Sequence, residues 1–190
     1  MMQRSDVSRF DTAELDELPA DLKDRLEPAA ERSGFVPNIF RALGRRPDEL
    51  RAFLDYHDAL MDSDDGLSKA ERELVVVATS GANDCLYCVV AHGAILRLRT
   101  KEPTLADHVA VNPHGCDLQP RQRAIVDFAM VVSQTPNELS DEHFETARKA
   151  GLSDDELWDI GSIAALFAAS NRLAHLMRLQ PNEEFYAMGR

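Results

Sequence analysis

Four residues near the middle of the chain carry side chains that can exchange protons and electrons: Glu73, Cys85, Cys88 and His92. Cys85 and Cys88 form a CxxC pair, whose thiols can cycle between the reduced form and a disulfide. Cys88 and His92 are four residues apart, which places them on one face of a helix. Cys85 and His92 are seven residues apart, ~10 Å along a helix axis, so His92 can contact Cys88 but hardly Cys85.

Glu73 joins this group only if the chain reverses between it and the cysteines. It lies twelve residues before Cys85, and residues 81–84, Gly-Ala-Asn-Asp, can form the turn. Glu73 would then lie ~12 Å before the turn and His92 ~10 Å after it, so the two come level. In this interpretation Glu73 orients His92, and His92 takes the proton of Cys88.

The two thiols are favoured by different neighbours. The predicted helix begins near Cys85, and the partial positive charge of a helix N-terminus lowers the pKa of a first-turn thiol. The histidine instead favours Cys88, so the residues leave open which thiol is the nucleophile. Tyr87, between them, either donates a hydrogen bond to a thiolate or a substrate, or packs as an aromatic residue of the first helical turn.

Helices are the elements that must position these side chains. Ser68 and Glu71 match a capping box, in which each satisfies the other's backbone N–H, so a helix is expected to begin there. A second helix is expected from near Cys85 to about Arg99. Caps and apolar spacing predict further helices over residues 21–32, 37–43, 47–61, 104–111, 121–133, 140–151 and 153–179.

The fold class that follows is all-α, because no segment shows sustained period-2 alternation with hairpin turns. We predict an N-terminal arm over residues 1–20 and a single helical domain over residues 21–190, with the CxxC hairpin at 68–100. The capping pattern of Ser68 returns at Ser153, which predicts a weak internal repeat of two helical hairpins.

Composition limits the partners and the compartment. The 190 residues carry 21 Lys+Arg against 33 Asp+Glu, a net charge of −12, which argues against nucleic acid or an anionic membrane as partner. No targeting segment or membrane-spanning run is visible. Three cysteines are too few, and odd in number, for a secreted disulfide framework. We therefore expect a protein of the reducing cytoplasm.

Other candidate groups receive structural interpretations. The four remaining scattered histidines are expected to be capping, surface or core residues: His57, His108, His143 and His175. We expect no metal, because Cys85, Cys88 and His92 are only three ligands and lie on one helix. Covalent haem would need a histidine directly after the second cysteine, where the chain has Val89.

Three further features outside the CxxC segment are also interpreted structurally. His114 and Cys116 share a Pro/Gly loop in which we expect no second metal or redox site. Trp158 is predicted to lie in the core. The Asn171-Arg172 pair interrupts a long apolar pattern, and it predicts a buried polar contact or a subunit contact.

The order Glu73, then Cys85-Leu86-Tyr87-Cys88, then His92 resembles the alkylhydroperoxidase D-like family, which belongs with the carboxymuconolactone decarboxylases. Residues 34–43, GFVPNIFRAL, resemble the entry segment of its peroxidase-related branch, as does the tail around Asn171. The resemblance covers about residues 34 to 181, and the E…CxxCxxxH spacing is its most specific part.

The resemblance implies an all-helical homo-oligomer, a trimer or a hexamer, that reduces hydroperoxides without flavin or haem. In it, Cys88 matches the peroxide-attacking cysteine and Cys85 the resolving one, with His92 and Glu73 as the proton relay, often through a water. An external dithiol, lipoyl-linked or thioredoxin-like, would restore both thiols. The best-known members have histidine just before the second cysteine, where this chain has Tyr87, so a relay member is missing or replaced.

Two other functions fit the same residues less well. A carboxymuconolactone decarboxylase-like lyase works by acid–base chemistry and does not require a CxxC pair, so the intact pair argues against it. A non-enzymatic redox sensor would use the same cysteines as a switch. It would be oxidised stoichiometrically, with negligible turnover.

Overall fold

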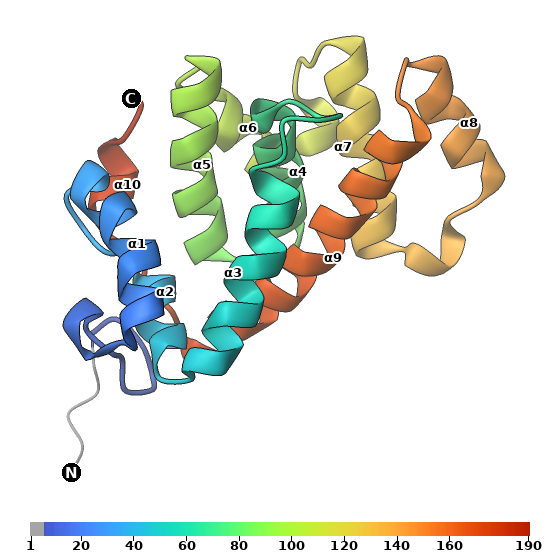
Figure 1. The fold of residues 1–190 in the computed structure, drawn as a ribbon. Coiled ribbons are helices and arrows are strands. Elements are labelled where there is room, and N and C mark those ends of the chain that lie inside the picture. Colours follow the sequence, from blue (N-terminus) through green and yellow to red (C-terminus); the bar gives the residue numbers. More distant parts are fainter. Residues whose placement is uncertain (1–5) are drawn as a thin grey trace.

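The computed structural model describes residues 6–190, and within them the chain forms helices and no strand (Figure 1). The all-α fold predicted from the sequence is confirmed. The α-helices are α1 (Ala20–Ser33), α2 (Asn38–Gly44), α3 (Pro47–Met61), α4 (Lys69–Ala82), α5 (Leu86–Thr100), α6 (Leu105–Val111), α7 (Pro120–Gln134), α8 (Asp141–Lys149), α9 (Asp154–Met177) and α10 (Glu184–Ala187). Turns of 3-10 helix lie at Leu15–Glu17, Pro113–Gly115 and Pro136–Glu138. Among the residues described, no helix combines the length and apolarity that crossing a bilayer requires.

Helix α4 lies at the centre, where it packs against α5, α6, α7 and α9. Its apolar run, residues 74–78, is buried on every side of the helix. The predicted capping box is present: the Glu71 N–H donates to Ser68 Oγ at 3.3 Å, and the Ser68 N–H donates to Glu71 Oε2 at 2.8 Å. Because α4 is buried and begins at a defined residue, the position of Glu73 along the helix axis is fixed relative to the adjacent helices.

The chain reverses sharply between α4 and α5. Asp84 adopts a left-handed conformation with φ 53°, and the Cys85 N–H donates to the Ser80 carbonyl at 2.9 Å. Asn and Asp tolerate the left-handed region better than most residues, so the Asn83-Asp84 pair suits this turn. Helices α4 and α5 therefore form an antiparallel hairpin with the two cysteines at its closed end.

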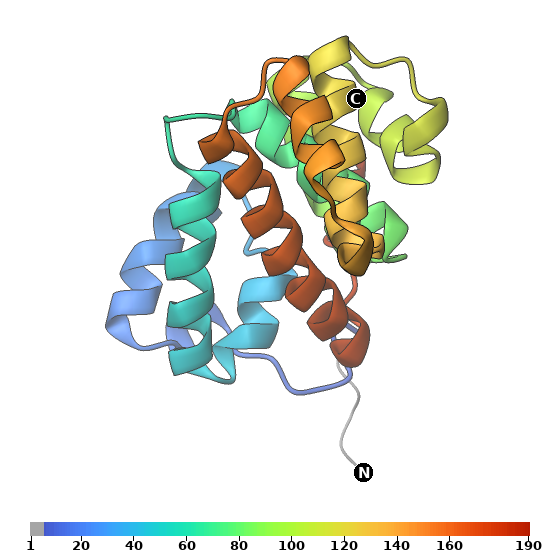
Figure 2. The same cartoon turned by 90° about the vertical axis from the view of Figure 1, so that its right-hand side faces the viewer.

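The segment that matches this hairpin in the weak repeat has a different structure. Residues 154–177 form one continuous helix, α9, which lies alongside α3 (Figure 2). The positions equivalent to the turn at 81–84 are residues 166–169, Leu-Phe-Ala-Ala. These residues favour helix and include no glycine or asparagine, so the chain does not turn there. The prediction of a second hairpin is wrong, although the capping box at Ser153 is present.

The expectation that Trp158 lies in the core is also wrong. Its side chain is 76% exposed, while Ile163 and Phe167 farther along α9 are buried. Trp158 lies near the start of α9, and only part of the surface of this helix faces the core. Composition alone does not reveal which side of such a helix faces solvent.

The N-terminal segment lies against the far end of the same chain. The Arg9 N–H donates to the Met177 carbonyl at 2.6 Å, and the Gln180 N–H donates to the Val7 carbonyl at 2.9 Å. Figure 1 shows α1, α2 and α10 gathered at one end of the molecule, with the C-terminus beside them. Residues 1–5 of the predicted arm lie outside the described residues.

Candidate redox site

The CxxC pair lies where the N-terminus of α5 meets α4 and α9. Cys85 is the N-cap residue of α5, and Cys88 lies in the first turn. Both are free cysteines and are buried, with 1% and 2% of their surfaces exposed. The pair is therefore shielded from bulk solvent and close to the positive end of a 15-residue helix.

Glu73 and His92 are brought together across the hairpin. His92 Nδ1 lies 2.8 Å from Glu73 Oε2, and the two side chains are 14% and 4% exposed. Because a carboxylate accepts, Nδ1 carries the hydrogen, and Nε2 of the neutral ring is left as the acceptor. Arg99 Nε lies 3.9 Å from the other Glu73 oxygen, which adds a compensating positive charge. Glu73 thus fixes the tautomer of His92.

The ring of His92 is held by aromatic neighbours. The Phe167 ring packs nearly perpendicular to it, with centroids 4.7 Å apart, and the centroid of the His57 ring lies 6.4 Å away. Within residues 6–190 the structure shows no hydrogen bond from His92 to either thiol. The structure therefore assembles the Glu73–His92 half of the expected relay, and the link from His92 to Cys88 stays a prediction.

The environment favours a thiolate on Cys85. Its pKa is lowered from 9.0 to about 7. The Cys88 thiol, which can donate a hydrogen bond to the Cys85 sulfur, is the largest cause. The Cys88 backbone N–H, the charge of His175 and the Asn171 amide act in the same direction, and burial opposes them.

The environment of Cys88 has the opposite effect. Its pKa is raised well above 9.0, first by the neighbouring Cys85 and then by burial, while the polar groups of Asn171 and Ser170 act against the shift. Two thiols this close titrate as a pair. The opposite shifts favour a thiolate on Cys85 over one on Cys88.

Asn171 links the cysteines to the buried polar contacts between α4 and α9. Its Nδ2 donates to Ser80 Oγ at 3.0 Å, and its Oδ1 accepts from Asn83 Nδ2 at 3.0 Å. Asn171 is 1% exposed, so the buried polar contact expected from the sequence is confirmed, whereas its neighbour Arg172 is exposed. Sequence reasoning missed that this amide also faces the two thiols.

Tyr87 holds α5 against α2. Its hydroxyl oxygen accepts a hydrogen bond from the Ile39 N–H at 3.1 Å, and the residue is 4% exposed. Burial raises the pKa of this hydroxyl, so it stays protonated. The structure thus gives Tyr87 a role in positioning the first turn of α5, whatever further contact it makes during a reaction.

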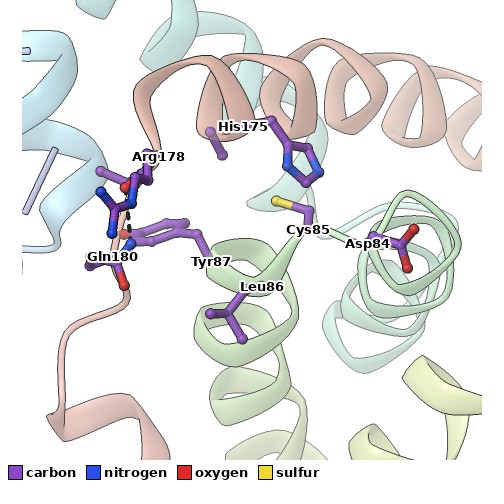
Figure 3. Close-up of a pocket in the computed structure, with 9 residues that line it drawn as sticks. Asp84, Cys85, Leu86, Tyr87, His175, Arg178 and Gln180 are labelled. Atoms are coloured by element: carbon purple, nitrogen blue, oxygen red, sulfur yellow. Dashed lines mark hydrogen bonds between the residues drawn. The ribbon is translucent and has the colours of Figure 1, made fainter. Parts of the chain in front are cut away.

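A pocket of about 290 Å³ opens on the Cys85 side of the pair. Figure 3 shows His175 beside Cys85 on one wall, with Tyr87 and Arg178 across from them. His175 Nε2 lies 2.9 Å from the Asn83 carbonyl oxygen, to which it donates. The sequence interpretation gave His175 a capping, surface or core role. Its position near Cys85 was not visible because the two residues are 90 positions apart.

No metal-binding cluster is found near these residues. Across the described part of the chain, no three His, Cys, Asp or Glu side chains gather in a way that could hold a metal ion. The third cysteine, Cys116, is half-buried beyond α6, and burial raises the pKa of its thiol.

Comparisons with known proteins identify the family of the chain. The model of the carboxymuconolactone decarboxylase family matches residues 47–110. A structure described as the alkylhydroperoxidase AhpD core of an uncharacterized peroxidase-related protein from Ralstonia eutropha JMP134 is 52% identical. It covers 98% of both chains with a TM-score of 0.95. An uncharacterized peroxidase-related protein from Silicibacter sp. TM1040 is 32% identical over 100% of both chains, with a TM-score of 0.91.

More distant relatives share the fold alone. The debrominase Bmp8 is 22% identical over 90% of this chain and 93% of its own, with a TM-score of 0.73. No curated protein sequence matches the chain. The identity and full coverage of the first two structures show that the chain belongs to the AhpD-like, peroxidase-related family of the carboxymuconolactone decarboxylase superfamily.

Proposed function

We propose that the protein is a thiol-dependent peroxidase that reduces organic hydroperoxides through Cys85 and Cys88. One observation carries the proposal: a buried, hydrogen-bonded Glu73–His92 pair lies on the same hairpin as a CxxC pair whose N-cap thiol has a pKa of about 7. The lowered pKa of Cys85 supplies the thiolate that resolves an oxidised Cys88, and a histidine held by a carboxylate can take the proton that Cys88 must lose before it attacks. Membership in a family with peroxidase-related relatives supports the same function.

The oxidative half of the cycle follows the family resemblance. Cys88 loses its proton through a water to His92, and its sulfur attacks the distal peroxide oxygen. The O–O bond breaks, the alcohol leaves with the proton that His92 returns, and Cys88 becomes a sulfenic acid. The Cys85 thiolate then attacks the Cys88 sulfur, the S–O bond breaks, and the disulfide forms; the hydroxide that leaves takes a proton from solvent and becomes water. An external dithiol, lipoyl-linked or thioredoxin-like, is oxidised to a disulfide and restores both thiols.

Mass mapping of the cysteines after peroxide treatment tests this function. Fully reduced, metal-free protein is mixed with a stoichiometric amount of cumene hydroperoxide and quenched with iodoacetamide. We expect a rapid Cys85–Cys88 disulfide, and a sulfenic acid on Cys88 in Cys85→Ser. Sulfenic acid on Cys85 in Cys88→Ser, with Cys88 unreactive in Cys85→Ser, would reverse the two roles. Three free thiols beside unconsumed peroxide would refute the peroxidase.

The match to the carboxymuconolactone decarboxylase family model supports a second candidate, a lyase. Acid–base chemistry on this fold would survive replacement of both Cys85 and Cys88 by serine, whereas peroxide reduction would not. A redox sensor is distinguished by turnover. It would be oxidised once per molecule and would not consume further peroxide with dithiothreitol or dihydrolipoamide present.

The proposed setting is the cytoplasm, where a reducing environment would return the pair to the dithiol form that the structure shows. We also propose a homo-oligomer, a trimer or a hexamer. Tyr56 and Trp158, 48% and 76% exposed, line an apolar groove of about 350 Å³ that another copy would cover. Sedimentation equilibrium of the protein and of Trp158→Glu tests this assembly: a monomer with the native sequence would contradict it.

A further inference from the structure

The pocket beside Cys85 contains a titratable group that the proposed peroxide chemistry does not use. His175 comes from the last turns of α9 and lies beside Cys85, while the relay residues Glu73 and His92 lie on α4 and α5 (Figure 3). His175 is exposed to solvent, so it can exchange protons with water. His92 is mostly buried and hydrogen-bonded to Glu73. Two histidines on different helices thus lie near the CxxC pair, His92 on α5 and His175 on α9.

The orientation of His175 is fixed by the backbone. Because the Asn83 carbonyl accepts, the Nε2 of His175 carries a hydrogen, and Nδ1 is the position that gains or loses a proton. The positive charge of this ring stabilises the Cys85 thiolate. Asn83 also donates from its side chain to Asn171, which faces the same sulfur. One turn between α4 and α5 therefore positions both partners of Cys85.

The pocket gives a thiol reagent a path to this sulfur. About 290 Å³ is enough for the reactive end of a small dithiol or of a thiol-bearing arm. Leu86, 55% exposed, forms an apolar part of the lining, and Arg178 adds positive charge. The arginine favours an approaching thiolate over a neutral thiol.

We propose that the external dithiol attacks the Cys85 sulfur through this pocket, and that His175 is the acid–base residue of this reductive half of the cycle. The proposal rests on the thiol peroxidase function. In the first step a reductant thiolate bonds to Cys85 Sγ, the Cys85–Cys88 bond breaks, and Cys88 leaves as a thiolate that gains a proton from water through His92. In the second step the other reductant thiol gives its proton to His175 and attacks the first reductant sulfur. Cys85 then leaves as a thiolate beside protonated His175.

This assignment gives each histidine its own sulfur. Cys85 is the final leaving group, and a thiol with a low pKa leaves faster. The charged and titratable groups around Cys85 are Asp84 from the turn, His175 and Arg178 from the end of α9, and Tyr87 and Cys88 from α5. Tyr87 stays neutral, and the imidazole of His175 is the side chain among them whose ring nitrogens can both accept and donate a proton.

The test starts from a disulfide made without peroxide, so its outcome does not depend on the peroxidase activity. Protein is oxidised with diamide, and reduction by dithiothreitol is followed anaerobically across a range of pH in the native protein and in His175→Gln. Glutamine keeps an N–H donor for the Asn83 carbonyl and removes the titratable charge. His108→Gln, an exposed histidine on α6, is the matched control.

In His175→Gln we expect reduction to slow about tenfold at neutral pH and its pH profile to move upward as the pKa of Cys85 rises. In a Cys85→Ser background, the same change leaves the oxidation of Cys88 by peroxide unaltered. A reduction rate and pH profile equal to those of His108→Gln would overturn the role of His175. Oxidation of Cys88 that fails with the native His175 in place would count against the peroxidase instead.

A second measurement needs no variant at position 175. The diamide-oxidised native protein is treated with glutathione, a monothiol, and quenched with iodoacetamide. Peptide mass spectrometry is expected to find glutathione on Cys85 and the alkyl group on Cys88. Glutathione on Cys88 with Cys85 alkylated would refute attack through the pocket, even if His175→Gln failed to fold.

Discussion

Glu73 Oε2 lies 2.8 Å from His92 Nδ1, across the hairpin of α4 and α5. The carboxylate is 4% exposed, and Arg99 Nε lies 3.9 Å from its other oxygen. A buried carboxylate is costly unless it is paired, so this contact both stabilises the hairpin and fixes the histidine. Loss of the negative charge of Glu73 should therefore affect the proton transfer more than a change in the shape of its side chain.

Replacement of Glu73 by Gln tests the relay. Glutamine has nearly the same volume and can still accept from His92 Nδ1, but it cannot stabilise a protonated imidazole. We expect peroxide-driven disulfide formation to slow by about a hundredfold, measured by stopped-flow oxidation of the reduced protein. Glu145→Gln, an exposed position on α8, serves as the control. Equal rates in the two variants would remove Glu73 from the relay.

The thiol pKa values predict the order in which the cysteines react. The pKa of Cys85 is about 7, whereas burial raises that of Cys116 above 9.0. The thiolate is the reactive form, so alkylation of Cys85 should rise as the pH increases through about 7 and be lost below it. Cys116 should react only at more alkaline pH. Iodoacetamide labelling with peptide mapping measures both thiols in one sample, and parallel pH profiles would contradict the assignment.

Asn171 and Arg172 are adjacent residues with different surroundings. Replacement of Asn171 by Ala removes a partner from Ser80 and from Asn83, both of which bond to it. We expect the free energy of unfolding to fall by about 1–3 kcal/mol, because buried polar groups lose their hydrogen bonds. The pKa of Cys85 should rise as well. Arg172→Ala, at an exposed site, should change stability by less than about 0.5 kcal/mol in urea denaturation.

Arg121 joins the two capping boxes. Its guanidinium contacts Glu71 at 2.7 Å, forms an ion pair with Glu156, and donates to the Gly151 carbonyl at 3.1 Å. One side chain from α7 thus binds the starts of α4 and α9. The weak repeat in the sequence marks a real structural relationship at these two helix starts, although only the first is followed by a hairpin.

Arg121→Met should lower stability by about 1–2 kcal/mol at neutral pH, since the arginine is partly exposed. The pKa values of Glu71 and Glu156 lie below 4.5, because Arg121 and backbone hydrogen bonds outweigh the opposing effect of burial. This stabilisation is fully present above pH 4.5 and is lost as the pH falls through the lowered values. The difference between the native protein and the variant should shrink in acid. Arg148→Met, which removes an exposed ion pair, is the control and should show no such trend.

Much of the site could be predicted because it is local. The capping box at Ser68, the helix rise of 1.5 Å per residue and a turn at 81–84 are enough to bring Glu73 level with His92. His175 and Asn171 could not be placed in this way. They reach Cys85 from α9 through tertiary packing, and no spacing rule connects positions so far apart in the chain. A polar residue in an apolar helix was the only local signal, and it pointed to Asn171 alone.

Gly81 allows the close approach of α4 and α6. This approach also determines the position of the turn that precedes Cys85. A Cβ at this position would lie 2.4 Å from the Ala110 carbonyl oxygen and 2.8 Å from its Cα, both backbone atoms that cannot rotate away. Gly81→Ala should therefore lower the free energy of unfolding by about 2–4 kcal/mol.

Gly161 in α9 is the matched comparison, because a Cβ there meets no atom within 4 Å. Alanine at this helical position should raise stability by about 0.5–1 kcal/mol, since it restricts the unfolded chain. Urea denaturation of the two variants measures the difference. Because the turn after Gly81 positions Asn83, Gly81→Ala should also raise the pKa of Cys85, whereas Gly161→Ala should leave it unchanged. Equal stability and equal thiol titration in the two variants would show that the contact between α4 and α6 does not position the redox pair.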